Sequence, residues 1–291
     1  MKALALLFSI FYLPLQAQEF QLVFAPPNGL EYTEKLKASV IRDMGNGMTN
    51  EDTAETTTEV KVTKTSAGYD IQRTQTAIRT MRNARPFENP MNKILLGRKL
   101  TYQISPAGEF QALKGAETIG EEIQKTLPPQ LQSLASAMSP EALKNREQGE
   151  WNSRIGELIG LRFKSGEQKE TVQEYPFQTG PIKYTTIMRF SEVRKDGEKN
   201  LVTIAFRYDS DAAALKSSEN GTQAAGSAVA TSDKPVIRGE GERVIDLNTM
   251  TIQSEKTRQE IMTPIDVPGR GKFFPKRLET REYSYQFKPA P

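Results

Sequence analysis

The sequence predicts an α+β fold that is mostly β, with two repeated, curved antiparallel sheets joined by a central helical segment. Several stretches alternate apolar and polar residues, which is typical of strands with one wet face. Only 37% of the 291 residues are hydrophobic, which disfavours fully buried parallel strands. Helical periodicity is confined to one central region. We therefore expect four parts: residues 1–17, 18–115, 116–159 and 160–291.

Residues 1–17 read as a secretory signal peptide. Lys2 precedes an apolar run over residues 3–13, and the small residue Ala17 marks the expected cleavage site. We expect export to the periplasm or the medium. The run is shorter than the roughly 20 residues of a membrane span, so no span is expected in the mature chain. Gln18 stands where a lipoprotein signal needs cysteine, so no lipid anchor is expected.

The first β repeat is expected over residues 18–115. Residues 59–64 and 69–77 alternate on either side of Ala67-Gly68, which predicts a hairpin. A second strand pair is predicted within 97–114, around a turn at Pro106–Gly108. Residues 43–57, rich in Gly, Asn, Thr and acidic residues, are expected to form a long loop.

The central segment is expected to be helical. Residues 116–126 carry Ile119 and Ile123 at helical spacing, and a second short apolar stripe follows over 131–138. A further helix should begin after Ser139, a good N-cap, with Pro140 at the first helical position. Trp151, the sole tryptophan, is interpreted as packing between this helix and a sheet, with a ligand-stacking platform as the alternative.

The second β repeat is expected over residues 160–291. Residues 184–194 and 201–208 flank a turn at Asp196-Gly197. The stretch 239–256 repeats the strand–turn–strand order of 97–114. The last strand should be buried on one side, since Tyr283, Tyr285 and Phe287 alternate with polar residues. A low-complexity insertion at 209–235 is expected to be disordered.

The composition excludes much chemistry. The chain has no histidine and no cysteine, so Ser-His-Asp and Cys-His catalysis, Cys/His zinc sites and disulfides are impossible. We expect no enzyme, no cofactor and no metal. A net charge of +3 does not indicate nucleic-acid binding, so we expect no nucleic-acid partner.

Two charged features leave alternatives open. The basic stretch from Arg73 to Lys99 is interpreted as a solvated strand edge, with contact to anionic lipid or acidic polymers as the alternative. Close carboxylates, as in a hydrolase without histidine, are interpreted as solvated charges. These carboxylates are Glu240, Glu242, Glu279 and Glu282.

The chain resembles, in outline, bacterial secreted domains of unknown function related to the periplasmic lipoprotein-carrier fold, an open half-barrel covered by helices. The resemblance rests on the signal, on Gly239-Glu240-Gly241 leading into a strand and turn over residues 244–249, and on the helical insert around Pro128 and Trp151. It implies an apolar cavity for acyl chains, and no family residue of known role carries over. By this analogy the cavity candidates are Ile119, Ile123, Leu131, Leu134, Met138, Trp151, Phe206 and Ile252.

The function expected from these features is that of a non-enzymatic envelope protein. It would bind an apolar or amphipathic ligand, such as a lipid, or a partner protein on a concave β surface. The alternative is a structural or assembly factor of the envelope that uses strand edges to hold other proteins.

Overall fold

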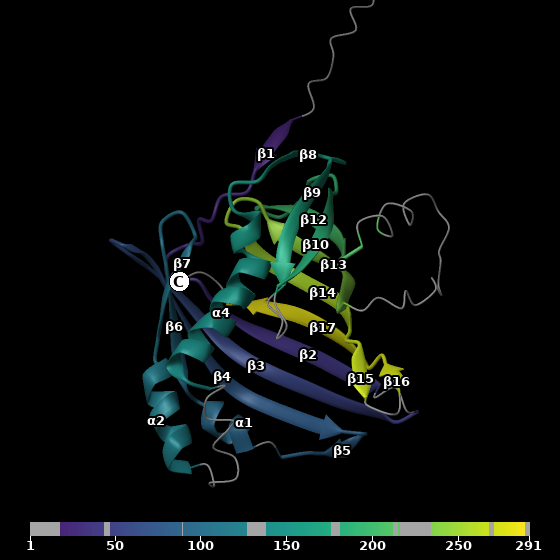
Figure 1. Cartoon of the computed structure of the whole chain (residues 1–291). Coiled ribbons are helices and arrows are strands. Elements are labelled where there is room, and N and C mark those ends of the chain that lie inside the picture. Colours follow the sequence, from purple (N-terminus) through teal and green to yellow (C-terminus); the bar gives the residue numbers. More distant parts are fainter. Residues whose placement is uncertain are drawn as a thin grey trace, which may run out of the picture.

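A computed structural model of the chain describes residues 18–43, 47–88, 90–126, 138–175, 181–211, 215, 234–267 and 271–288. A 13-stranded antiparallel sheet dominates it, with the main order β7-β6-β4-β3-β2-β17-β14-β13-β12-β10-β9. Strand β11 pairs with β12, and β5 pairs with β4. Two small two-stranded sheets, β1-β8 and β15-β16, lie outside it (Figure 1). The prediction of a mostly β fold is confirmed.

The strands of the large sheet include several long ones. Their bounds are β2 Glu31–Asp43, β3 Thr49–Thr65, β4 Gly68–Arg82, β5 Arg85–Pro86, β6 Lys99–Ile104, β7 Phe110–Lys114, β9 Gln168–Tyr175, β10 Ile182–Phe190, β11 Arg194–Asp196, β12 Lys199–Asp209, β13 Val236–Asp246, β14 Thr251–Met262 and β17 Lys276–Phe287. The small sheets comprise β1 Glu19–Gln21, β8 Arg162–Lys164, β15 Ile265–Val267 and β16 Gly271–Phe273.

The two predicted sheets are one sheet. The last strand, β17, pairs with β2 from Lys276↔Asp43 to Phe287↔Tyr32, and this seam joins the early strands to the late ones. Both strands alternate in polarity and run antiparallel, so their backbones can pair along their whole length. The predicted repeat itself stays a prediction: 97–114 and 239–256 both contain hairpins, β6-β7 and β13-β14, but the second pair is much longer.

The local hairpin predictions are confirmed, and one loop prediction is wrong. Strands β3 and β4 pair around the turn at residues 66–67, and β10 pairs with β12. Residues 49–57, expected to form a loop, belong to β3 and pair with β2 and β4 on either side. This stretch is rich in β-branched threonine, and neighbours on both edges supply the hydrogen bonds that a polar strand needs.

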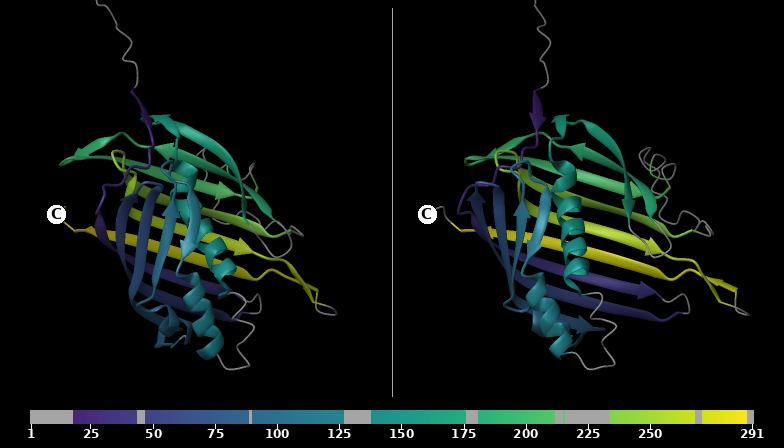
Figure 2. Two further views of the ribbon diagram at one scale, coloured as in Figure 1. Left: turned by 90° about the vertical axis from the view of Figure 1, so that its left-hand side faces the viewer. Right: turned by 60° about the vertical axis from the view of Figure 1, so that its left-hand side comes forward.

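The helices are α1 Pro90–Leu95, α2 Ala116–Thr126 and α4 Pro140–Arg154, followed by the 3₁₀ helix η2 Gly156–Leu158. The bounds of α2 match the prediction. Helix α4 begins as predicted, with Ser139 Oγ accepting a hydrogen bond from the Ala142 amide at 3.2 Å. The sheet curls around α4, which crosses one face diagonally (Figure 2).

We call the face that carries α4 the inner face and the opposite one the outer face. Inner-face positions supply the apolar core, for example Val60, Ile71, Tyr102 and Ile204. The outer face has rows of alternating charge across neighbouring strands, which suit a solvated surface. One such row runs Arg79, Glu55, Lys37, Glu282, Lys256 and Glu242.

Two glycines on β13 accommodate aromatic rings of β12 on the inner face. A Cβ at Gly241 would lie 2.5 Å from the Phe206 ring and 2.6 Å from the Lys256 carbonyl oxygen. A Cβ at Gly239 would meet the Tyr208 ring at 2.4 Å. The rings therefore lie over backbone that only glycine leaves open.

Several predictions fall outside the described residues. These are the signal peptide at 1–17, the apolar stripe at Leu131 and Leu134, and most of the insertion at 209–235. Among the residues that are described, none of the helices is long and apolar enough to cross a bilayer.

The glycine positions give a matched pair of substitutions. Gly241→Ala should lower the free energy of unfolding by roughly 2 kcal/mol, because the new methyl group overlaps Phe206. Gly149→Ala, in α4 with nothing within 4 Å of the added methyl, should raise it by about 1 kcal/mol through helix propensity. Urea unfolding measures both, and a destabilisation of equal size in the two variants would contradict this packing.

Candidate functional site: the space beneath helix α4

The cavity candidates occupy different places. Ile119, Ile123, Met138, Trp151 and Ile252 all belong to the main core cluster, with Ile119 and Ile123 fully buried. Phe206 is partly buried and packs against that cluster. Only Trp151 and Ile252 of the candidates line the small cavity beneath α4. Leu131 and Leu134 lie outside the described residues.

Trp151 packs between α4 and the sheet, as predicted. Its ring meets Phe24 edge-on at 5.3 Å and Tyr102 at 6.2 Å between centroids. Its indole Nε1–H donates to the Gly108 carbonyl oxygen at 3.0 Å. The polar end of the ring is therefore satisfied and its apolar body is buried.

A buried ionic cluster lies beside Trp151, at the end of α4. Arg154 Nη2 donates to Glu34 on β2 at 3.2 Å, and Arg154 Nε donates to Glu255 on β14 at 2.9 Å. Arg154 also donates to the Tyr285 hydroxyl on β17 and to Glu150 one turn earlier in α4. One side chain thus connects the helix to three neighbouring strands at the seam of the sheet.

Two further arginines complete the ionic cluster. Arg73 on β4 donates to Glu34 at 2.6 Å. Arg243 on β13 donates to Glu255 at 2.5 Å and to the Arg154 carbonyl oxygen at 2.8 Å. The interpretation of Arg73 as a solvated strand-edge residue is therefore wrong, because β4 lies inside the sheet and Arg73 points to the inner face toward a buried carboxylate.

Burial and pairing act in opposite directions on the carboxylates. Burial raises the pKa of Glu34, but the guanidinium groups of Arg73 and Arg154 lower it by a larger amount. The pKa of Glu34 is therefore about 2. Burial likewise raises the pKa of Glu255, and Arg243 and Arg154 bring it below its usual value. Burial raises the pKa of Tyr32 to about 12. The cluster therefore holds ionised carboxylates and neutral tyrosines at neutral pH.

A cavity of about 70 Å³ adjoins this cluster. Such a volume holds a few water molecules and is well below the roughly 300–1,000 Å³ of ordinary ligand pockets. The acyl-sized apolar cavity implied by the resemblance is therefore not open in this structure. The lining combines aromatic and aliphatic side chains with charged ones: Phe24, Leu30, Tyr32, Ile71, Tyr102, Trp151, Met250, Ile252, Tyr285 and Phe287, with Glu34, Arg73, Glu150 and Arg154.

The carboxylates considered for hydrolysis do not share one environment. Glu279 is buried between Arg277 at 2.8 Å and Arg281 at 2.6 Å, so its interpretation as a solvated charge is wrong. Glu282 pairs with Lys256 across the strands, and Glu240 lies 3.8 Å from Arg207. Within the described part of the chain, no three acidic side chains gather as a metal site.

The ionic cluster was not anticipated from the sequence. A partial signal was present in the strand alternation, because Arg243 occupies an inward-facing position in line with Ile237 and Ile245, whereas Glu255 at the same spacing is in line with the polar residues Gln253 and Thr257. Charged residues at such positions are rarely buried unless they are paired. The pairing could not be read from the sequence, since the Arg154 partners lie 101 and 120 residues away.

Removal of Arg154 should be costly. Arg154→Ala leaves Glu34 and Glu255 short of a buried partner, and we expect a loss of about 3–5 kcal/mol in the free energy of unfolding. Arg146→Ala, which removes an arginine from the exposed side of the same helix, should change it by no more than about 0.5 kcal/mol. Similar losses of unfolding free energy in the two variants would contradict a large contribution of the ionic cluster to stability.

Acid should weaken the fold through Glu34. Its folded pKa lies below its ordinary value of 4.5, so its contribution is complete above that pH and is lost as pH falls toward about 2. The shift corresponds to a stability change on the order of 3 kcal/mol. Urea unfolding across this pH range should show a smaller decline in Glu34→Gln than in the parent protein, and parallel declines would contradict the assignment.

Comparisons with known proteins show similarity in fold alone. No protein-family model matches the chain, and no curated protein matches it either. Lipovitellin, from a structure titled for its lipid–protein interactions, matches with a TM-score of 0.50 and 10% identity. The match covers 91% of this chain and 26% of lipovitellin, so the chain spans about a quarter of that relative. A match to Pseudomonas aeruginosa OccK5 covers 91% of this chain and 99% of OccK5 at 6% identity, but its TM-score of 0.24 supports no argument.

Proposed function

We propose that this is an exported, non-enzymatic protein that binds a lipid or another amphipathic ligand between α4 and the inner face of its sheet. The observation that carries the proposal is the cavity beneath α4, where aromatic side chains meet buried charges. The fold similarity to lipovitellin, whose structure concerns lipid–protein interactions, supports the same class of ligand.

The lining suits an amphipathic molecule. Phe24, Trp151 and Phe287 contribute aromatic surface, and Arg73 and Arg154 contribute charged groups with their carboxylate partners. An acyl chain would gain contact with the rings, and a polar head would meet groups that can hydrogen-bond.

Entry of such a ligand requires α4 to move, because the closed cavity is too small. Only Leu143, Trp151 and Arg154 of this 15-residue helix are buried. Movement of α4 therefore has to expose Leu143 and Trp151 and to break or stretch the ion pairs of Arg154. Trp151 and the ionic cluster together attach its C-terminal end.

The sole tryptophan provides a direct test. A brominated stearate that enters beneath α4 should quench most of the Trp151 fluorescence, since bromine quenches only at close contact. Stearate without bromine serves as the matched amphiphile that should leave the emission intensity largely unquenched. Native mass spectrometry of the same sample should show the stearate bound to the folded protein.

A displaced reporter serves as the control. In a Trp151→Phe, Ile265→Trp variant the tryptophan moves to β15 of the small β15-β16 sheet, where Ile265 is 47% exposed and lines neither the cavity beneath α4 nor a groove of the large sheet. Its emission should not respond to the brominated stearate. Absence of quenching in the parent protein, or equal quenching at both positions, would refute binding beneath α4.

A second function, assembly of envelope proteins, is favoured by the open sheet. Strand β9 ends the sheet and pairs only with β10 among the described strands, and edge strands can accept a strand from another protein. Val172→Pro in β9 should abolish capture of an envelope partner in a cross-linking pull-down, whereas Val23→Pro, outside the strands, should retain it. Equal recovery with both variants would remove this candidate.

A further inference from the structure

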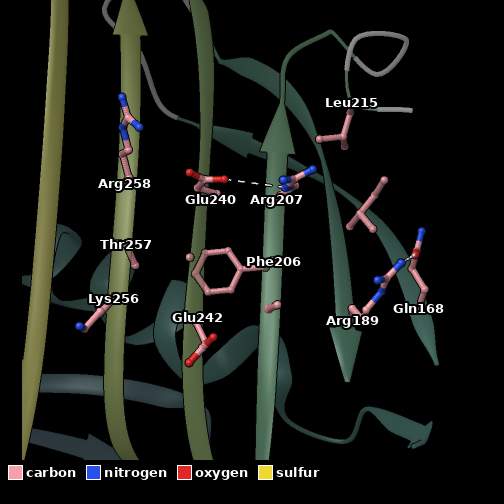
Figure 3. Close-up of a pocket in the computed structure, with 13 residues that line it drawn as sticks. Gln168, Arg189, Phe206, Arg207, Leu215, Glu240, Glu242, Lys256, Thr257 and Arg258 are labelled. Carbon is pink, nitrogen blue, oxygen red and sulfur yellow. Dashed lines mark hydrogen bonds and ion pairs between the residues drawn. The ribbon is translucent and has the colours of Figure 1, made fainter. Parts of the chain in front are cut away.

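A groove of about 600 Å³ lies on the outer face, on the opposite side of the sheet from α4 (Figure 3). Strands β10, β12, β13 and β14 form its floor, and Leu215 stands at one side. Its volume is within the range of small-molecule sites, unlike the cavity beneath α4.

The charges of this groove are unbalanced. Four cationic side chains line it, against the carboxylates Glu240 and Glu242. The cationic residues are Arg189, Arg207, Lys256 and Arg258. An excess of cations at neutral pH favours an anionic ligand.

The pairing across the strands leaves guanidinium groups available. Glu240 lies opposite both Arg207 and Arg258, so one carboxylate faces two arginines. Among the described residues, Glu240 forms one ion pair, with Arg207 at 3.8 Å, and Arg258 forms none. Arginine presents a planar fork that suits carboxylate and phosphate groups.

Apolar groups stand next to these arginines. Ile187 lies opposite Arg207 on the neighbouring strand, and Ala205 is exposed between Arg189 and Glu242. Leu215 adds an aliphatic side chain to the lining. Ile187 and Leu215 are 8% and 6% exposed, so an apolar stem would lie against their exposed edges and against Ala205.

We propose that the outer-face groove binds an amphiphilic anion, with the head above the strands on the guanidinium groups of Arg207 and Arg258, which flank Glu240, and the stem toward Ile187 and Leu215. This site is separate from the proposed site beneath α4, because the sheet lies between them.

Titration calorimetry below the micelle concentration tests the proposal with three probes. Octyl phosphate should bind the parent protein, and octyl glucoside, which has the same stem and a neutral head, should bind at least about tenfold more weakly. Inorganic phosphate, which has no stem, should also bind more weakly. Higher salt should weaken the octyl phosphate interaction.

The double variant Arg207→Gln, Arg258→Gln should reduce octyl phosphate affinity at least about tenfold while its melting temperature stays that of the parent. Arg238→Gln is the matched control, since Arg238 is an exposed β13 arginine that pairs with Glu260 and does not line the groove. Binding by the double variant at parental affinity, equal binding of octyl glucoside, or equal binding of inorganic phosphate would each overturn the proposal. Trp151 emission distinguishes the two sites, because a brominated ligand in the outer groove leaves it unquenched.

Discussion

The position of α4 depends on the ion pairs that Arg154 makes with Glu34 and Glu255. These carboxylates come from strands on either side of β17, so the guanidinium group spans the seam that joins the early and late strands. Arg73 and Arg243 extend the pairing to β4 and β13. Because each buried charge has its partner, the cluster is tolerated inside the molecule, and loss of one member leaves another uncompensated.

The two faces of the sheet carry side chains of different chemistry. Inward positions supply the core and the ionic cluster, whereas outward positions carry charges that alternate from strand to strand. Gly239 and Gly241 let aromatic rings lie against the inner face of β13. The two proposed ligand sites follow this division: an aromatic and charged space under the helix, and an open cationic groove on the outside.

The two sites also differ in what binding would require. The space beneath α4 is closed, so occupation is coupled to movement of a helix whose buried side chains are Leu143, Trp151 and Arg154. The outer groove is already an open space of about 600 Å³. A ligand beneath α4 would accordingly change the conformation of the protein. A ligand in the outer groove would chiefly neutralise surface charge.

Short-range features were predictable from the sequence because neighbouring residues determine them. The Ser139 cap, the bounds of α2, the β3-β4 turn and the alternation of Tyr283, Tyr285 and Phe287 all follow from local propensity and period. Composition also excluded histidine and cysteine chemistry. Only the tertiary structure decided that β17 pairs with β2, that residues 49–57 are strand, and that Arg154 joins Glu34 and Glu255. Those contacts link residues far apart in the chain, where no local pattern specifies the partner and only the register of the whole sheet brings the charges together.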